Sequence, residues 1–326
     1  MNANEKAMSL ADFAEHVRDN ILAHFPEEYQ TRKVRVDEVI KEGNVRLTGL
    51  TLIKGESGAA PILYINKFYD AYKDGWPVDD VLDKIAENYI DILNSCPRQI
   101  QIPEMSYKNV KNRLRVSVVY DKTNADLLAN LESVSIGCGY SLIAWLELSD
   151  LIFEDAIIKI TKDIFRSFNV TQKTLFKDAL SASAAESPAV LNSLLDAVVE
   201  NMGTSDAANL LNGETSAYSD GILVLTSKDN FAGAAALFYP GVMEKIAEIV
   251  GGNYFVLPSS VHEVLIKPDD GRMSPLELAQ MVKSVNEAQV QPSEQLGNRV
   301  LYYDREAQML KVAYDLDVDI QKRAVC

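Results

Sequence analysis

The chain has 326 residues, of which 47% are hydrophobic, and this is enough apolar material for two or three domains with substantial cores. Its formal net charge of -15 removes the general attraction to phosphate on which most nucleic-acid binding depends, so we expect no nucleic-acid partner. Its cysteines, Cys96, Cys138 and Cys326, are far apart and odd in number, a pattern typical of free thiols in a reducing compartment. With neither a signal peptide nor a membrane span recognisable, we expect a cytoplasmic protein that does not bind membranes.

Residues 1–100 predict an N-terminal α/β unit. Apolar residues recur at helical spacing after Ser9, which indicates an amphipathic first helix. Two apolar segments that surround Glu42-Gly43-Asn44 predict a hairpin. In order, the predicted elements are a helix after Ser9, strands at 33–40, 45–53 and 62–65, a helix at 67–73 capped by Asn66, and a helix from Pro77 to about Leu93.

Residues 101–202 predict a central α/β region. The run at 140–148 is apolar enough for the centre of a sheet. The other predicted elements are a helix at 107–114, a strand at 115–120, a helix at 125–131, a strand at 156–160, and helices at 161–168, 171–184 and 191–202. Residues 203–219 are small, polar and contain glycine, which is typical of a linker.

Residues 220–318 predict a C-terminal α+β unit, which precedes a tail at 319–326. The clearest signal is the helix that begins at Pro275, because Ser274 and Glu277 form a capping box around it. The other predicted elements are strands at 222–226 and 232–239, a helix at 242–250, strands at 254–257 and 261–266, and a closing hairpin at 299–303 and 309–314. The unit reads β-β-α-β-β-α-β-β, and the predicted fold class is α+β, with several mixed or antiparallel sheets and flanking helices.

Ser259, Ser260, His262 and Glu263 place two hydroxyls, a base and a carboxylate close together in the sequence. A hydrolase needs such groups, because serine becomes nucleophilic only beside an oriented base. In the predicted strand, however, neighbouring side chains point to opposite faces, so His262 and Glu263 would diverge. A partly buried histidine with satisfied hydrogen bonds and the polar rim of a ligand site are the alternative interpretations.

Acidic residues at two places are the candidate cation ligands. Asp269 and Asp270 could contact a metal, although they also have the composition of a turn. Asp315, Asp317 and Asp319 alternate, but the rest of a calcium loop is missing and a solvated tail is the favoured interpretation. We find no nucleotide-binding loop and no zinc motif, and therefore expect neither a cofactor nor a metal.

Three segments resemble a known family: PILYINKFYDAYKDGWPVDDVLDKIAENY, FYPGVMEKIAEIVGGNYFVLPSSVHEVLIKPDDG and LAQMVKSVNEAQVQPSEQLGNRVLYYD. Their most distinctive pieces are LPSSVHEVL and the PDDG turn. Over nearly its whole length, the chain resembles an uncharacterised bacterial family of Firmicutes, common in gut Clostridia and known only as a domain of unknown function. The resemblance implies a cytoplasmic bacterial protein, an accessory or mobile-element product, and supplies no catalytic residues.

These observations predict a noncatalytic binding or regulatory protein that acts through an unknown protein partner, because no complete catalytic motif is recognisable. A hydrolase with a site around Ser259 to Glu263 is one alternative. An acidic inhibitor that mimics nucleic acid is another, and it requires carboxylates gathered on one face.

Overall fold

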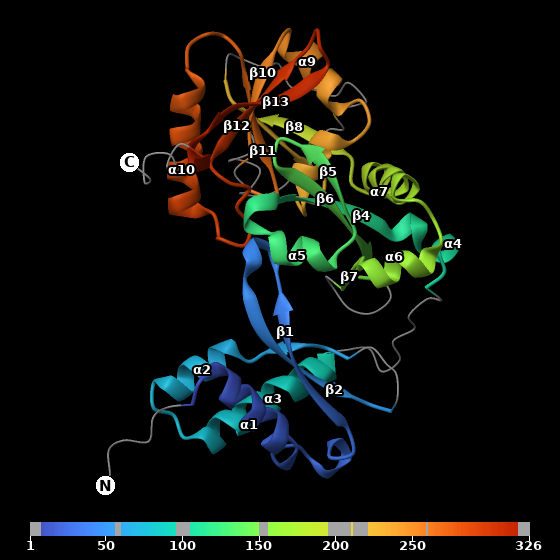
Figure 1. Ribbon diagram of the computed structural model, residues 1–326, viewed down its shortest axis with the longest axis vertical. Helices are drawn as coiled ribbons and strands as arrows, with labels where there is room; N and C mark the ends of the chain where they lie inside the picture. Colours follow the sequence, from blue (N-terminus) through green and yellow to red (C-terminus); the bar gives the residue numbers. More distant parts are fainter. Residues whose placement is uncertain are drawn as a thin grey trace. The chain divides into compact units, whose positions relative to one another are not determined.

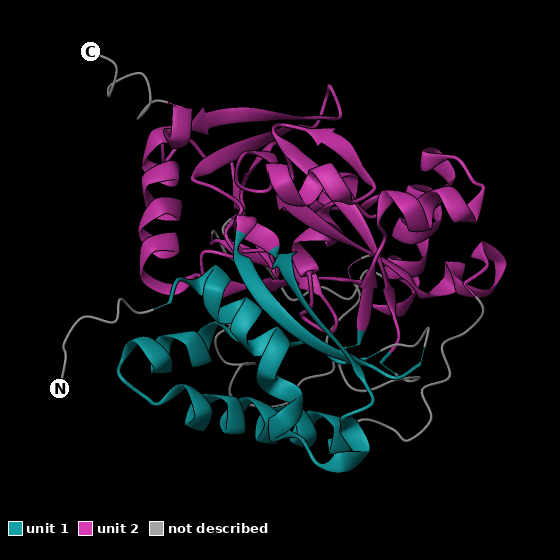
Figure 2. Ribbon diagram, turned by 60° about the horizontal axis from the view of Figure 1, so that its bottom comes forward, with its two compact units in different colours: residues 1–41, 45–102, 149–156 teal, residues 42–44, 103–148, 157–326 magenta. Residues whose placement is uncertain are grey.

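The computed structural model describes residues 8–55, 60–95, 105–149, 156–194, 210, 221–258 and 260–318. Within these ranges the fold is α+β, as predicted, with helices beside several antiparallel sheets (Figure 1). The chain divides into two compact units (Figure 2). Unit 1 comprises residues 1–41, 45–102 and 149–156, and unit 2 comprises residues 42–44, 103–148 and 157–326.

Unit 1 is built on an antiparallel sheet of order β1-β2-β3. The predicted helices and strands of this unit are confirmed, with bounds that differ by a few residues at most. They are α1 (Leu10–Asn20), β1 (Lys33–Ile40), β2 (Arg46–Ile53), β3 (Leu63–Tyr64), α2 (Asn66–Lys73) and α3 (Val78–Ser95). Ser9 begins α1 through a capping box with Asp12. Asn66 does not cap α2, because its side-chain oxygen accepts the backbone N–H of Thr48 at 2.8 Å and so joins the helix to β2.

The helices of unit 1 bury one apolar stripe each against the sheet. Phe13 and Val17 of α1 and Leu82 of α3 are fully buried in the same core as Leu50. Tyr89 supplies the polar link, since its hydroxyl accepts from the N–H of Leu52 and donates to the carbonyl of Pro61, both at 2.8 Å. Burial of apolar side chains and the two hydrogen bonds of the Tyr89 hydroxyl therefore both hold α3 against the sheet.

Unit 2 contains two antiparallel sheets. The larger has the order β13-β12-β10-β11-β9-β8, and the smaller has the order β4-β6-β5 with β7 also paired to β6. The strands are β4 (Leu114–Tyr120), β5 (Ser133–Gly137), β6 (Tyr140–Glu147), β7 (Ile157–Lys159), β8 (Ala189–Ser193), β9 (Leu223–Ser227), β10 (Tyr254–Leu257), β11 (Val264–Pro268), β12 (Arg299–Asp304) and β13 (Met309–Asp315). The central place of β6 confirms the prediction from its apolar run.

The helices of unit 2 belong to two cores. Both sheets share the larger core with α7, η7 and α9, whereas α10 packs with β10 and β12 in a smaller one. The described helices are α4 (Tyr107–Val110), α5 (Ala125–Asn130), α6 (Lys162–Phe168), α7 (Gln172–Glu186), the 3-10 helix η7 (Gly233–Phe238), α9 (Val242–Val250) and α10 (Pro275–Gln289). The capping box of Ser274 and Glu277 begins α10 as predicted.

The strand predicted at 232–239 is wrong, because η7 occupies this segment. Its apolar run is rich in alanine and buried on all sides, so it lacks the alternation of a half-exposed strand. Both edges of the neighbouring β9 are already paired, to β8 and to β11. The C-terminal unit therefore has one strand fewer than predicted.

Two further segments of unit 2 differ from prediction. The helix predicted at 191–202 is wrong at its start, because residues up to Ser193 belong to β8 and pair with β9; residues 195–202 lie outside the described ranges. The predicted linker at 203–219 also lies outside them, except for the buried Leu210. Strand β5 was not predicted, because it is short and polar and ends in the turn Gly137-Cys138-Gly139, whose three residues all have positive φ.

A buried cation links the two sheets of unit 2. Arg299, at the start of β12, is only 7% exposed. Its guanidinium donates to the Asp315 carboxylate at 2.6 Å and to the Tyr120 hydroxyl at 2.9 Å. It also donates to the carbonyl of Cys138 and lies over the Tyr120 ring. Because Tyr120 and Cys138 belong to the smaller sheet and its turn, Arg299 ties that sheet to β12 and β13.

The surroundings of Arg299 are shaped for its guanidinium. A side chain at Gly139 would overlap the guanidinium, and the φ of 76° at this position also favours glycine. Burial raises the pKa of Tyr120 to about 12, although the positive charge of Arg299 lowers it. Tyr120 therefore remains a neutral hydrogen-bonding group at physiological pH.

The carboxylates near the C-terminus belong to the same network, so the predicted solvated tail is wrong for two of them. Asp315 is the ion-pair partner of Arg299. Asp317 accepts from the backbone N–H of Asn298 at 3.1 Å and from the Tyr120 hydroxyl at 3.3 Å. Asp319 lies outside the described residues.

Replacing Arg299 with methionine should lower the free energy of unfolding of unit 2 by about 3–5 kcal/mol, because the Asp315 carboxylate would remain buried without its partner. Lys283→Met is the control, since Lys283 forms an exposed pair with Glu287 and should cost below about 1 kcal/mol. Denaturant titration measures both values. Equal losses in the two variants would contradict the role given to Arg299.

Candidate functional site

The segment that carries Ser260, His262 and Glu263 connects β10 to β11 and is not a strand. β11 begins at Val264 and not at residue 261 as predicted. The local cause is a turn in which the Ser260 hydroxyl accepts the backbone N–H of His262 at 3.0 Å. The prediction that His262 and Glu263 occupy opposite faces of a strand is therefore wrong in its premise. Ser259 lies outside the described residues.

The described members of this polar group do not converge on a serine. Ser260 is 6% exposed, and its oxygen faces a backbone amide. Glu263 is exposed, and no hydrogen bond joins it to another described residue. Within the described ranges, no hydroxyl or thiol is hydrogen-bonded to the His262 ring. The geometry of a serine nucleophile activated by histidine is thus not formed by these residues.

The His262 ring instead lies between two loops. Its Nδ1 is 3.2 Å from the carbonyl oxygen of Asn230, and because a carbonyl can only accept, Nδ1 carries the proton in this contact. Its Nε2 is 3.7 Å from a carboxylate oxygen of Glu294. The side chain of His262 is 35% exposed, so one edge of the ring reaches the surface.

The loop at 228–232, between β9 and η7, is held in shape by its own hydrogen bonds. The Asp229 carboxylate accepts from the Ser227 hydroxyl at 2.7 Å and from the N–H of Phe231 at 3.1 Å. Asn230 and Ala232 have left-handed φ angles of 56° and 52°. Non-glycine residues adopt this conformation at a cost, which the surrounding contacts must outweigh. The backbone on either side of Phe231 is therefore fixed.

Phe231 is the exposed aromatic residue that this loop presents. The residue is 46% exposed, and its ring meets Trp145 edge-on, with centroids 5.4 Å apart. The His262 ring lies on it as well, at 6.1 Å. Trp145 is buried and donates to the Ser117 hydroxyl at 2.9 Å, so it forms a fixed support. We call Phe231, Trp145, His262 and Glu294 the Phe231 site.

Asp269 and Asp270 have protein partners in place of a cation. Asp269 accepts from the Tyr302 hydroxyl at 2.9 Å. Asp270 is 2.5 Å from the ammonium of Lys267, and this hydrogen bond lowers the pKa of the Asp270 carboxyl. Among the residues the structure describes, no three His, Cys, Asp or Glu side chains are grouped to hold a metal ion.

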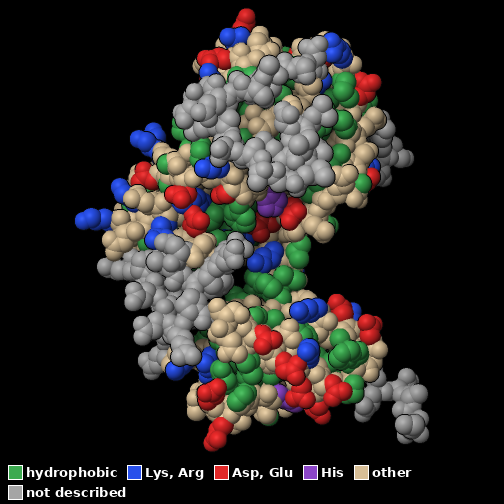
Figure 3. All heavy atoms as spheres, turned by 180° about the vertical axis from the view of Figure 1, so that it is seen from behind, with side chains coloured by type: hydrophobic (Ala, Val, Ile, Leu, Met, Phe, Trp, Pro, Cys, Tyr) green, Lys and Arg blue, Asp and Glu red, His purple; other side chains and the backbone are tan. Residues whose placement is uncertain are grey.

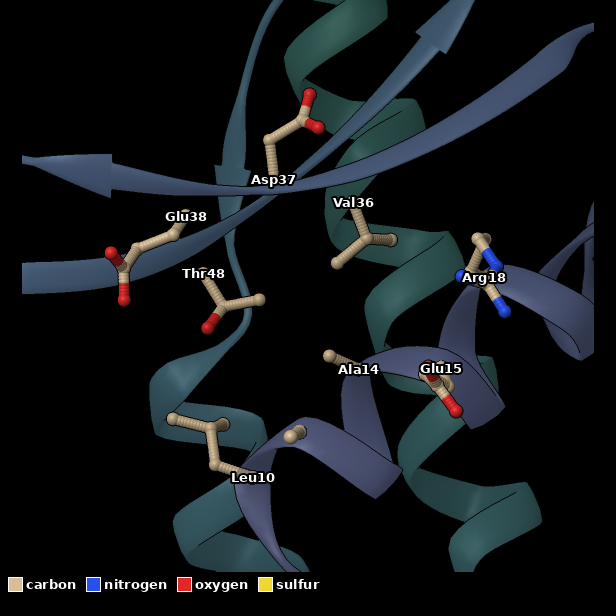
Figure 4. Close-up of a pocket in the computed structure, with 9 residues that line it drawn as sticks. Leu10, Ala14, Glu15, Arg18, Val36, Asp37, Glu38 and Thr48 are labelled. Carbon is tan, nitrogen blue, oxygen red and sulfur yellow. The ribbon is translucent and has the colours of Figure 1, made fainter.

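Unit 1 has a pocket of about 480 Å³ between α1 and the strands β1 and β2 (Figure 4). Ala14 and Val36 face each other across it, whereas Asp37 points away. Arg18, at its border, already pairs with Asp19 at 2.8 Å. The charges around the pocket are mixed and exposed, so they indicate no particular ligand.

The described elements define an α+β protein of two units that presents a supported aromatic side chain on a fixed loop. The chain belongs to a family of unknown function, DUF5688, whose model matches residues 10–305. Membership in an uncharacterised family confirms the resemblance at that level. No curated protein and no solved structure matches the chain. None of the described helices is long and apolar enough to cross a membrane.

Sequence reasoning located His262 but missed Phe231 and Trp145. The signal for Phe231 was weak: an aromatic residue after the polar run Ser227-Lys228-Asp229-Asn230, where a surface turn is expected. Trp145 lies 86 positions earlier, in β6, and its contact with Phe231 depends on how the two sheets pack. Glu294 likewise approaches His262 only in the folded chain.

Gly233→Ala should destabilise unit 2 by about 1–3 kcal/mol, because the new methyl group would overlap the His262 carbonyl and the Thr226 hydroxyl. Gly252→Ala is the matched control, since nothing lies within 4 Å of the added carbon. Thermal or denaturant unfolding compares the two. If both variants unfold alike, the loop and the His262 turn are not packed as described.

Proposed function

We propose that this protein is a noncatalytic binding or regulatory protein that contacts another protein through the Phe231 site. The observation that carries the proposal is the half-exposed Phe231 ring on a loop whose conformation is fixed from both sides. An aromatic ring that is already fixed before binding can be buried by a partner with little loss of conformational entropy. On the cysteine pattern and the family resemblance, we propose a bacterial, cytoplasmic setting.

The surroundings of Phe231 suit a protein partner. Aromatic side chains supply much of the binding energy at protein interfaces, most of all when they are rigid before binding. Trp145 and the loop hydrogen bonds provide that rigidity. His262 and Glu294, both partly exposed, supply polar groups beside the aromatic ring, as at the rim of an interface.

The two alternatives gain less support. A hydrolase with Ser260 as its nucleophile would require the buried Ser260 hydroxyl to leave the His262 amide and reach solvent. Mimicry of nucleic acid would require carboxylates gathered on one face. On the face in Figure 3, acidic and basic side chains both occur across the described surface. A protein partner accounts for Phe231, which neither alternative does.

Phe231→Ala should weaken partner binding at least tenfold, because truncating a central aromatic residue of an interface costs about 2 kcal/mol or more. The tagged chain is used to capture proteins from its source cells, the candidate partner is identified by mass spectrometry, and its affinity is then measured with purified components. Trp76→Ala is the control, since Trp76 is an exposed aromatic residue of unit 1, 55% accessible, outside the Phe231 site.

Two results would contradict the proposal. One is a partner that binds the wild-type chain and Phe231→Ala equally well. The other is turnover of an ester or peptide substrate that Ser260→Ala abolishes, which would identify a hydrolase. A partner lost in Phe231→Ala and retained in Trp76→Ala, without such turnover, is the expected outcome.

A further inference from the structure

A second pocket lies beside α7 in unit 2 and shares no residue with the Phe231 site. Its volume is about 470 Å³. Figure 1 shows α7 beside the β4-β6-β5 sheet, and the pocket opens between this helix and the strands β5 and β6. Its apolar lining consists of Val134, Ile136, Leu142, Phe176, Leu180 and Pro240.

The apolar part of this pocket suits a hydrocarbon or aromatic body. Leu142 and Phe176 are 2% and 4% exposed and belong to the main core, so they form a fixed wall. Val134 and Ile136, of the edge strand β5, are half-buried and leave apolar surface in contact with water. Small-molecule sites have volumes of about 300–1,000 Å³, are mostly apolar and carry a few polar groups. The pocket fits that description.

The polar groups are two lysines of α7. Lys173 and Lys177 line the pocket, are exposed and lie four residues apart, so their ammonium groups project from the same helix face and repel each other. Neither forms an ion pair with a carboxylate of the described residues. The first turn of α7 contains no acidic residue of its own, and the positive end of the helix dipole lies beside Lys173. The nearest carboxylate at this end is that of Glu132, which accepts from the Gln172 side chain at 2.8 Å.

This positive charge is local, in a chain whose net charge is -15. An anion placed between Lys173 and Lys177 would relieve their repulsion and pair with both. Its apolar part would then lie against Phe176 and the strands. Charge and apolar lining thus specify an anionic head with an apolar body.

We propose that the α7 pocket binds an amphiphilic carboxylate, with its carboxylate on Lys173 and Lys177 and its hydrocarbon chain in the apolar pocket. This is a binding site for a small acid and is independent of the protein contact proposed at Phe231. No bond is made or broken there.

Decanoate, kept below its micelle concentration, is the probe, and calorimetric titration of the full chain measures its affinity. 1-Decanol and a decyltrimethylammonium salt have the same chain with a neutral or positive head. Decanoate should bind at least tenfold more tightly than either, and added salt should weaken its binding. The double variant Lys173→Ala/Lys177→Ala should bind decanoate at least tenfold more weakly and 1-decanol unchanged.

Two further variants separate the parts of the site. Lys108→Ala removes an exposed lysine that does not line the pocket and should leave decanoate binding unchanged. Val134→Phe adds bulk inside the pocket and should weaken both decanoate and 1-decanol, with circular dichroism as the check on folding. The proposal is overturned if decanoate does not bind saturably, if 1-decanol binds equally well, or if the double lysine variant retains full affinity.

Discussion

The guanidinium of Arg299 is the constraint on which the arrangement of unit 2 depends. A buried cation is tolerated only when it is paired and hydrogen-bonded. Asp315 supplies the charge, while Tyr120 and the turn that contains Cys138 supply acceptors from the other sheet. Gly139 leaves the space that the guanidinium occupies. Two sheets that share an apolar core are thereby also tied by a directional polar contact.

The Phe231 site depends on this packing. Phe231 follows β9 of the larger sheet, and Trp145 is part of β6 of the smaller one. Their edge-on contact requires both sheets to be in place. The His262 ring, which follows β10 of the larger sheet, also contacts Phe231. The site is therefore a product of the fold of unit 2 and not of one local motif. This accounts for a rigid, exposed aromatic residue within a chain that carries no recognisable catalytic motif.

Elements with local signals could be predicted from the sequence, and elements decided by neighbours could not. The capping box at Ser274 and the hairpin around Gly43 depend on adjacent residues, and both are correct. The segment at 232–239 is apolar enough for a strand, but β9 has no free edge for it. For the site, His262 could be singled out by residue type, whereas Phe231 and Trp145 acquire their roles only through tertiary contact.

Site-specific photocrosslinking at position 231 shows whether Phe231 touches a protein partner. A photoreactive phenylalanine analogue is placed at position 231 in the intact chain within its source cells, and at position 76 in a parallel strain. We expect one defined crosslinked protein from position 231 that is absent from position 76. Absence of any crosslink from position 231, or the same products from both positions, would contradict it.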